Sequence, residues 1–477
     1  MRPGEILENL QVESMAAEGR CVARHNGKVI FVERAAPGDV VRASVLRSKS
    51  NYAEAQVLEV LKPSPLRSEP FCRHFGFCGG CVWQHIKYEV QLQYKQQQVA
   101  DSLQRIGGVN FPEILPIKAS EQIRFYRNRL DFTATNRRWL PPDELKELDN
   151  KTAVPVEPGL GFHVPKKFDQ VFDVHHCWLQ AEPGNAIRLA IKEIAIRHNI
   201  SFYNIRKQSG YLRTVTIRTT TTGEVMVIIQ VAEDRPDWLE IILNNLIEKF
   251  PQITSLVYTI NAKRNDTFHD LTMLVGYGKP FITEVMDKPD SSGKLYFQIG
   301  PKSFYQTNPK QAEVLYRTAW EMARLSGKEL VYDLYTGTGT IACYVAAQAA
   351  KVVGLEYVTE AVEDARNNAR INEIRNVSFF SGDIKDLLSG PFLHEHGRPD
   401  VVITDPPRAG MHEDVCRMLL LAAPQRIVYV SCNPATQARD IKILAEHYEV
   451  TAVQPVDMFP HTMHVENVVG LERRKTQ

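Results

Sequence analysis

The stretch Asp333-Leu-Tyr-Thr-Gly-Thr-Gly-Thr340 joins a short apolar run, 330–333, to an alanine-rich segment, 341–347. The apolar run is typical of a buried strand and the segment after it of a helix, so the stretch predicts a strand, loop and helix unit. Gly337 and Gly339 allow a tight turn close to a ligand, because a side chain at either position is expected to occupy the ligand's space. The unit predicts an α/β fold with a Rossmann-like sheet.

Two acidic residues follow in the order that a nucleoside site requires. Glu356 ends the apolar run 351–356, 19 positions after Gly337, where doubly wound folds place the carboxylate that holds ribose hydroxyls. Asp383 follows the predicted strand 377–380 and is expected to face the adenine. The loop lacks the third glycine of a dinucleotide site and the lysine of a P-loop. The predicted ligand is therefore an adenosine without phosphates, S-adenosylmethionine.

Two further strands end in reactive groups at the same edge of the sheet. The run 401–405 ends in Asp405-Pro-Pro-Arg408, and the run 425–430 ends in Ser431-Cys-Asn-Pro434. An arginine after the prolines, in place of an aromatic ring, argues against methylation of exocyclic amines. Cys432 is predicted to be a nucleophile, provided that its surroundings lower the pKa of the thiol. For Cys21, Cys343 and Cys416 the favoured interpretation is a buried, inert thiol.

A cysteine beside a methyl donor suits methylation of a pyrimidine at C5. That carbon becomes nucleophilic only when a thiolate adds at C6, and a general base must then remove the C5 proton. The segment His461-Thr-Met-His464-Val-Glu466 offers candidates for the base. Glu466 is preferred, because partial burial raises a carboxylate's pKa toward that of a useful base, and His464 is the second choice.

These motifs together resemble the RNA uracil-5-methyltransferase family, most closely its members that act on bacterial 23S ribosomal RNA. The resemblance implies that Cys432 is the nucleophile, Glu466 the base and Asp405 a carboxylate that helps to hold the target base or the cofactor. The cofactor-binding positions that it implies are Gln306, Tyr335, Gly337, Gly339, Thr340, Glu356, Asp383 and Asp405. Thr336, Thr338 and Thr340 differ from the family's usual residues in the loop. RNA cytosine-5-methyltransferases usually carry another cysteine in the proline turn, which is absent here, so uracil is preferred.

A cluster of cysteines upstream predicts a metal site. Cys72, Cys78 and Cys81 lie within eleven residues, 71–81, and Cys177 is a candidate fourth ligand. In a reducing compartment such a cluster favours metal over disulfides. Three local thiols and a remote one suit an iron-sulfur cluster, while zinc with His74 or His85 stays an alternative. The resemblance implies a [4Fe-4S] cluster on the four cysteines.

The first 60 or so residues contain five short apolar runs separated by turns, which predict an OB-like barrel suited to single-stranded nucleic acid. The segment resembles a TRAM domain. Ribosomal members of the family carry this domain and the iron-sulfur motif, whereas members that methylate the tRNA T-loop generally lack both. The predicted substrate is therefore 23S ribosomal RNA, with tRNA, an RNA cytosine or a noncatalytic role in ribosome assembly as alternatives.

Three domains are expected. They are a TRAM barrel at 1–63, an α+β central RNA-binding domain with the iron-sulfur motif at 64–290, and the methyltransferase domain at 291–477. An amphipathic helix at 88–106 is expected to pack on the last of them. The net charge of +1 places any attraction for RNA in local basic patches.

No apolar run reaches the length of a membrane span, and residues 1–20 carry four glutamates and no apolar signal core. We therefore expect a cytoplasmic monomer without a membrane partner. The sequence leaves open which uridine is modified, whether one site or two are modified, and what the iron-sulfur cluster does.

Overall fold

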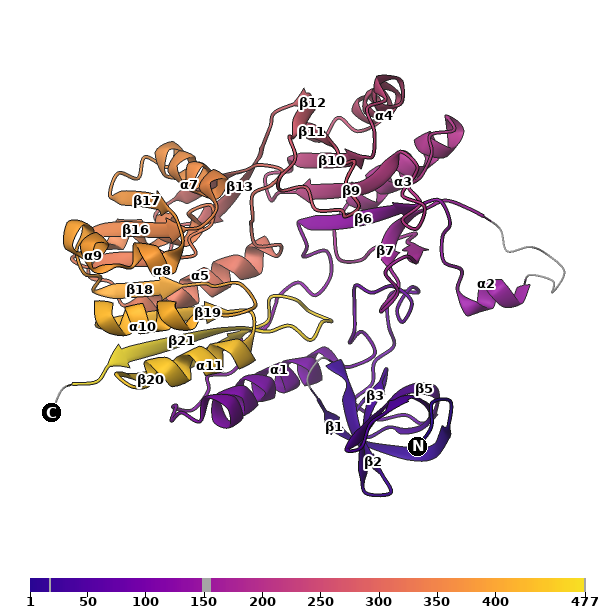
Figure 1. The fold of residues 1–477 in the computed structure, drawn as a ribbon, viewed down its shortest axis with the longest axis horizontal. Helices are drawn as coiled ribbons and strands as arrows, with labels where there is room; N and C mark the ends of the chain where they lie inside the picture. The colour runs from indigo at the N-terminus through magenta and orange to yellow at the C-terminus, as the bar shows by residue number, and fades with distance from the viewer. Residues whose placement is uncertain (17–18, 148–155, 476–477) are drawn as a thin grey trace.

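The computed structural model describes residues 1–16, 19–147 and 156–475. The N-terminal part is a closed barrel with the strand order β1-β2-β3-β5-β4. Its strands are β1 (Ile6–Met15), β2 (Cys21–His25), β3 (Lys28–Glu33), β4 (Val40–Ser48) and β5 (Tyr52–Lys62). Small and branched side chains such as Ala23, Ile30 and Val41 fill the interior completely. The predicted five-stranded barrel is confirmed, and it lies apart from the C-terminal sheet in Figure 1.

Helix α1 (Tyr88–Ser102), continued by the π-helical turn η2 (Leu103–Gly107), crosses from the barrel to the C-terminal sheet. Val99 and Leu103 are fully buried in the same core as the C-terminal strands. Apolar residues four apart lie on one face of a helix, so this face is the one that docks. The helix therefore packs on the C-terminal part of the chain, although the central sheet follows it in sequence.

The central part is a seven-stranded sheet of order β12-β11-β10-β9-β6-β7-β8. Its strands are β6 (Arg129–Thr135), β7 (Gly159–His163), β8 (Val171–Asp173), β9 (Leu212–Thr219), β10 (Val225–Val231), β11 (Ile253–Ile260) and β12 (Leu274–Gly278). All neighbours are antiparallel except β10 and β11. Its helices are α3 (Gly184–Arg197), α4 (Pro236–Lys249) and the short α2 (Pro142–Glu147). This α+β unit leads through the hairpin β13 (Ile282–Asp287) and β14 (Lys294–Ile299) into the last part.

The C-terminal part is a second seven-stranded sheet, of order β17-β16-β15-β18-β19-β21-β20. Its strands are β15 (Leu330–Leu334), β16 (Lys351–Glu356), β17 (Val377–Ser381), β18 (Val401–Thr404), β19 (Arg426–Ser431), β20 (Tyr448–Val456) and β21 (Glu466–Arg473). Helical elements alternate with the strands: α5 (Pro309–Ala323), α6 (Thr340–Val345), η3 (Ala346–Gln348), α7 (Thr359–Ile371), α8 (Ile384–Leu387), α9 (Gly390–His396), α10 (Glu413–Ala422) and α11 (Pro434–Leu444).

The five strands β15 to β19 are parallel, and β21 is antiparallel to both β19 and β20. Helices on both faces bury these strands, which explains runs such as Val401–Thr404 with no exposed residue. The strand order reverses between β15 and β18, and open α/β sheets bind ligands at the carboxyl ends of strands beside such a reversal. The predicted Rossmann-like fold is confirmed.

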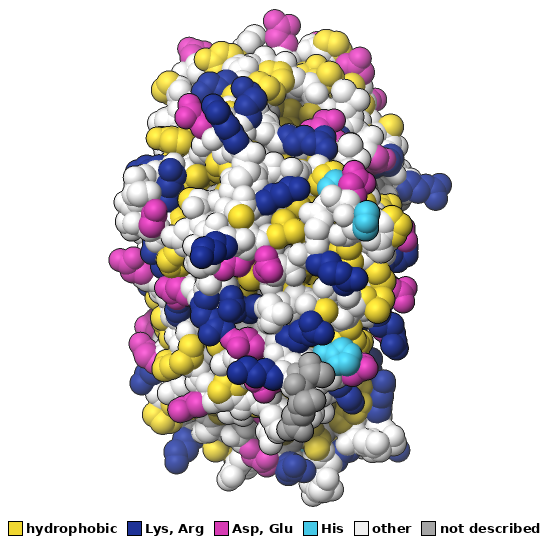
Figure 2. Space-filling view, turned by 90° about the vertical axis from the view of Figure 1, so that its left-hand side faces the viewer, with side chains coloured by type: hydrophobic (Ala, Val, Ile, Leu, Met, Phe, Trp, Pro, Cys, Tyr) yellow, Lys and Arg dark blue, Asp and Glu magenta, His cyan; other side chains and the backbone are white. Residues whose placement is uncertain are grey.

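Figure 2 shows the side of the molecule that lies on the left of Figure 1, where basic and acidic side chains are interspersed. This side carries no broad field of one sign, so it offers no large basic face for RNA. Among the helices that the structure describes, none is long and apolar enough to cross a membrane.

Candidate active site

The three predicted catalytic residues lie on adjacent strand ends of the C-terminal sheet. Leu334 pairs with Thr404, and Thr404 pairs with Tyr429, so Asp405 follows its strand at the reversal point. Ser431 pairs with Asn467 across the antiparallel β19 and β21, which places the next residues outward, Cys432 and Glu466, opposite each other. Neighbouring strands are about 5 Å apart, so the three side chains share one pocket.

Both carboxyl groups of this pocket hold protons more tightly than usual. Glu466 is 4% exposed, and burial followed by the charge of Asp405 raises its pKa well above the ordinary value, while Arg408 opposes the shift. Burial raises the pKa of Asp405 to about 7. Burial thus favours the protonated form of both groups, and the charge of Asp405 favours it further at Glu466.

The surroundings of Cys432 raise the pKa of its thiol to about 12, whereas a reactive cysteine was expected to have a lowered pKa. The causes are burial, then the charges of Glu466 and Asp405, with Arg408 acting in the opposite direction. Sequence order did not reveal that two buried carboxyls adjoin the sulfur. When these carboxyls carry protons, their repulsion of the thiolate disappears, and the Arg408 cation then favours it.

Arg408 connects the proline turn to the loop that carries the cysteine. Its carbonyl accepts hydrogen bonds from Asn433 Nδ2 at 3.0 Å and Thr436 Oγ1 at 3.2 Å. Its Nη2 lies 2.9 Å from His464 Nδ1. Burial and the Arg408 charge lower the pKa of His464 to about 4, so this imidazole is a neutral acceptor and a weak base. Glu466 is the stronger candidate for a base.

The glycine loop runs beside the strand-end acid that the sequence predicted. Gly337 N donates a hydrogen bond to Glu356 Oε2 at 3.0 Å. A Cβ at Gly337 would meet nothing within 4 Å, so this glycine faces the open space where a ligand fits. A Cβ at Gly339 would lie 2.9 Å from Ala365 Cβ and 3.0 Å from Phe379 Cζ. Close packing against α7 and β17 and a left-handed φ of 76° therefore both favour glycine at position 339.

The other predicted cofactor residues lie around this loop. Asp383 is half-buried, caps α8 by accepting from Lys385 N at 3.2 Å, and contributes with Glu356 to raising the pKa of Tyr335, after the larger effect of burial. Tyr335 is half-buried with a positive φ of 62°. The remaining two, Thr340 and Gln306, are buried.

Two residues that the sequence analysis did not assign to the site also contribute to it. Asp333 is completely buried; its Oδ2 accepts from Ala342 N at 3.0 Å, its Oδ1 has no hydrogen-bond partner, and its pKa is raised to about 7 by burial. The sequence did indicate a role for Asp333 in the site, because this residue begins the glycine stretch at the end of a buried strand. Tyr316 of α5 is buried, and burial followed by the charges of Asp405, Asp333 and Glu466 raises its pKa well above the ordinary value, while Gln306 opposes the shift. The position of Tyr316 within a helix gave no indication in the sequence that this residue belongs to the site.

The four predicted metal ligands line one small cavity between the barrel and the central sheet. Cys72, Cys78, Cys81 and Cys177 all border it, together with apolar side chains such as Phe162 and Leu179. His74 also lines the cavity, whereas His85 does not and instead bonds to Ala35 O at 3.0 Å. The structure therefore brings the remote Cys177 to the three local cysteines.

A hydrogen bond to a sulfur of this cavity is present, from Gly80 N to Cys78 Sγ at 3.4 Å. Burial raises the pKa of all four thiols, and nearby N–H groups oppose the shift at Cys72, Cys78 and Cys177. Four sulfurs around one cavity are the ligand set that an iron-sulfur cluster takes, so the residues fit four-thiolate ligation. No group of three or more His, Cys, Asp or Glu side chains in residues 1–16, 19–147 and 156–475 is arranged to hold a single metal ion.

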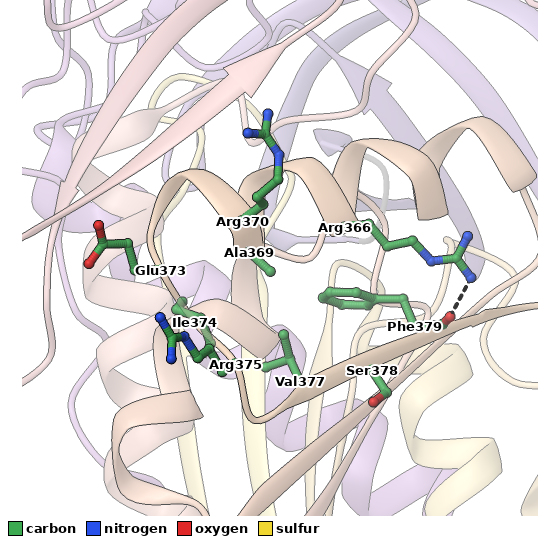
Figure 3. Close-up of a pocket in the computed structure, with 9 residues that line it drawn as sticks. All are labelled: Arg366, Ala369, Arg370, Glu373, Ile374, Arg375, Val377, Ser378 and Phe379. Carbon is green, nitrogen blue, oxygen red and sulfur yellow. Dashed lines mark hydrogen bonds between the residues drawn. The ribbon is translucent and has the colours of Figure 1, made fainter.

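A separate hollow lies at the edge of the C-terminal sheet, between α7 and β17 (Figure 3). Three of its lining residues are arginines: Arg366, Arg370 and Arg375. Arg366 donates to the carbonyl of Phe379 at 2.8 Å. None of the predicted catalytic or cofactor residues lines this hollow, so it is distinct from the candidate site.

A Rossmann-like sheet, a glycine loop beside a strand-end acid and a reactive pocket at the reversal point define a class I methyltransferase that uses S-adenosylmethionine. Residues 274–474 match the family model described as tRNA (Uracil-5-)-methyltransferase, and residues 7–58 match the TRAM domain. The chain belongs to the RNA uracil-5-methyltransferase family.

Several relatives cover nearly the whole chain. An uncharacterized RNA methyltransferase of Bacteroides thetaiotaomicron is 53% identical over 96% of this chain and 100% of its own length. One of Porphyromonas gingivalis is 52% identical, over 97% of this chain and 99% of its own. Among solved structures, the Pyrococcus abyssi tRNA (uracil-54, C5)-methyltransferase in complex with S-adenosyl-L-homocysteine is 29% identical. It covers 97% of this chain and 100% of its own, with a TM-score of 0.72.

Proposed function

We propose that this enzyme transfers a methyl group from S-adenosylmethionine to C5 of a specific uridine in 23S ribosomal RNA through a covalent adduct between Cys432 and C6. The observation that carries the proposal is the meeting of Asp405, Cys432 and Glu466 on adjacent strand ends beside the glycine loop. A pyrimidine C5 needs both a nucleophile and a base, and the pocket supplies both.

The residues of the cofactor pocket fit S-adenosylmethionine. Glu356 is positioned for the ribose, the open space at Gly337 admits the ligand, and the unpaired Asp333 Oδ1 is a buried acceptor suited to the ligand's ammonium group. When bound, the cofactor supplies a methyl group that is electrophilic because it is attached to a sulfonium.

The target base must leave the RNA stack to reach this pocket. The Cys432 thiolate forms a bond from Sγ to C6, and the C5–C6 electron pair moves into an enolate that makes C5 nucleophilic. After C5 is methylated, Glu466 as a carboxylate removes the C5 proton. The released electron pair restores the double bond and expels Cys432. Asp405, protonated up to about pH 7, donates a hydrogen bond to the base.

Replacement of Cys432 by Ala tests this mechanism. The variant is expected to bind S-adenosylmethionine and RNA but to produce no methylated uridine, because C5 stays unreactive without the adduct. A matched control is Cys416→Ala, since Cys416 is a buried thiol on α10 and is not one of the three residues that meet at the strand ends. Normal methylation by Cys432→Ala contradicts the covalent mechanism.

The choice of ribosomal RNA rests on the resemblance of the barrel and the cysteine cluster to ribosomal members of the family. A specific observation favours tRNA as the second candidate substrate, namely the similarity to the tRNA (uracil-54, C5)-methyltransferase. Nucleoside mass spectrometry after incubation with unmodified ribosomal RNA and, separately, unmodified tRNA distinguishes them. Methyluridine in ribosomal RNA alone is expected. Methyluridine in tRNA alone contradicts the proposal that ribosomal RNA is the substrate. Methylcytidine contradicts the proposal that the target nucleobase is uracil. No methylated product in either RNA favours a noncatalytic role in assembly.

We also propose that Cys72, Cys78, Cys81 and Cys177 hold a [4Fe-4S] cluster. Protein purified without oxygen is expected to contain iron and sulfide in equal amounts, and Cys177→Ser to lose most of both. Cys343→Ser, which changes a buried thiol outside the cavity, is the control. Zinc without sulfide contradicts the cluster. The protein is expected to be a cytoplasmic monomer, which size-exclusion chromatography with light scattering checks for the oligomeric state.

A further inference from the structure

Four rings and one arginine form a connected group on the central part of the molecule, here called the aromatic platform: Phe71, Arg124, Phe125, His176 and Trp178. The Trp178 ring centroid lies 4.6 Å from that of His176, 5.5 Å from that of Phe125 and 6.1 Å from that of Phe71. The Arg124 guanidinium carbon lies 4.1 Å from the Phe71 centroid and 5.5 Å from the Trp178 centroid.

The platform is open to solvent, which is unusual for so much aromatic surface. Phe125 is 40% exposed, Arg124 is exposed, and the other three rings are only partly covered. No carboxylate within the described parts of the chain pairs with Arg124, so its charge is available to a ligand. Exposed rings that are grouped in this way mark interaction sites, whereas scattered ones do not.

The backbone holds Phe125 in an unfavourable conformation. Its φ is +56°, in the left-handed region that bulky residues rarely adopt, and its N–H donates to Trp178 O at 2.7 Å. Two residues later, Arg127 N donates to Leu179 O at 2.7 Å. The surrounding structure thus imposes the strain and places the ring outward, beside Trp178. Strain of this kind gathers at functional sites.

The platform borders the cysteine cavity, which His176 and Trp178 help to line, and also contacts the loop that leads to Glu466. Phe71 precedes Cys72, while His176 and Trp178 flank Cys177. The Phe71 centroid lies 5.0 Å from that of His461, whose carbonyl accepts from Val82 N and Trp83 N. The chain continues from His461 to Glu466 in five residues. Phe71 of the platform thus contacts the same segment, 461–466, that ends in Glu466.

We propose that the aromatic platform binds unpaired nucleobases of the RNA that flank the target nucleotide, by stacking on Phe125 and Trp178, with Arg124 contacting the adjacent phosphate. Rings recognise bases through their faces, and an arginine beside them adds charge and stacking. The proposal deepens the proposed function, because it rests on RNA as the substrate of this site. The proposal also gives the cysteine cavity a structural role. A metal cluster bound by Cys72 and Cys177 joins the two segments that carry Phe71, His176 and Trp178, and so holds these three rings together.

The test measures equilibrium binding without S-adenosylmethionine, by fluorescence anisotropy of a short, labelled, single-stranded RNA of mixed sequence. A second probe has the same backbone but abasic nucleotides. Loss of one stacked base is expected to weaken binding of the normal probe to Phe125→Ala by about fivefold to a hundredfold. Binding of the abasic probe is expected to be unchanged. Phe125→Tyr keeps the ring and is expected to retain affinity.

Arg124→Ala is expected to weaken both probes alike and to reduce the salt dependence of binding, because a phosphate contact does not depend on the base. The matched controls are Tyr277→Ala, on the far edge strand β12 of the same sheet, and Arg197→Ala, at the end of α3. Both are exposed and outside the platform. Circular dichroism confirms that each variant is folded.

Equal binding of the normal probe by Phe125→Ala and the unchanged protein overturns the proposal, as does an equal loss with both probes. The outcome is independent of the proposed chemistry. If the enzyme methylates tRNA or cytosine, the ratio between the two probes still reports stacking. If the platform fails, Cys432→Ala still tests the methyl transfer.

Discussion

Replacing Lys95 by Met removes the cation of an ion pair buried between α1 and the segment before β21. Lys95 Nζ lies 2.6 Å from Asp457 Oδ1, and both side chains are 0% exposed. Asp457 also accepts from Tyr88 OH at 2.8 Å and from Phe459 N at 3.2 Å, and Lys95 donates to Phe459 O at 3.0 Å. The pair therefore attaches the helix to the segment 457–465 that leads to Glu466.

Methionine matches lysine in length but leaves the Asp457 carboxylate buried without a counter-charge. Loss of one partner of such a pair costs about 3–5 kcal/mol. We expect native-state hydrogen exchange of the α1 amides to accelerate by roughly a hundredfold to several thousandfold, since 1.4 kcal/mol corresponds to a factor of ten. Methyl transfer is expected to slow because Glu466 loses its fixed position.

The paired variant Lys95→Met with Asp457→Asn removes both charges and keeps an acceptor for Tyr88, so it is expected to recover most of the protection. Lys146→Met is the matched control. Its ion pair with Asp143 is exposed, and such pairs contribute about 0–1 kcal/mol. A change of less than threefold in Lys95→Met, or no recovery in the paired variant, refutes the reasoning.

Three further outcomes are expected. Both glycines have a positive φ, so alanine strains the backbone at either position; Gly337→Ala should weaken S-adenosylmethionine binding in calorimetry, whereas Gly339→Ala should lower Tm more than Gly337→Ala because only its Cβ also meets Ala365 and Phe379, and the reverse order of Tm contradicts the assignment. The raised pKa of Asp405, about 7, means that the folded state binds a proton more tightly than the unfolded state, so this group's contribution to stability falls as pH rises from about 4 to about 7. As the pH rises from about 5 to about 7.5, the Tm of Asp405→Asn should therefore fall less than the Tm of the unchanged enzyme. An equal fall in both proteins argues against burial as the cause of the raised pKa of Asp405. Glu466→Gln should accumulate an RNA adduct stable to denaturing electrophoresis, because the C5 proton stays in place; normal release shifts the role of base to His464 or water.

The fold was predictable where its signals are local. The stretch at 333–340 combines a buried strand, a glycine turn and a helix start, and these depend on neighbouring residues alone. The apolar runs that end in Asp405 and Ser431 predict strand ends at one edge for the same reason. The barrel was predictable because turns divide short strands at regular spacing.

The cysteine site was predictable in part. The three local thiols form a recognisable cluster in sequence, whereas Cys177 lies almost a hundred residues away and reaches the cavity only through the packing of the central sheet. The donor to the Cys78 sulfur, Gly80 N, is a backbone group and carries no signal in residue identity.

The sequence by itself determined which reactive groups exist and the strand ends that carry them, because local periodicity and residue type encode these. Tertiary structure alone decided how the groups influence each other. Only the pairing of β19 with β21 sets Glu466 opposite Cys432, and only burial beside Asp405 raises the pKa of the thiol instead of lowering it. Desolvation and charge repulsion depend on atoms brought together from distant parts of the chain.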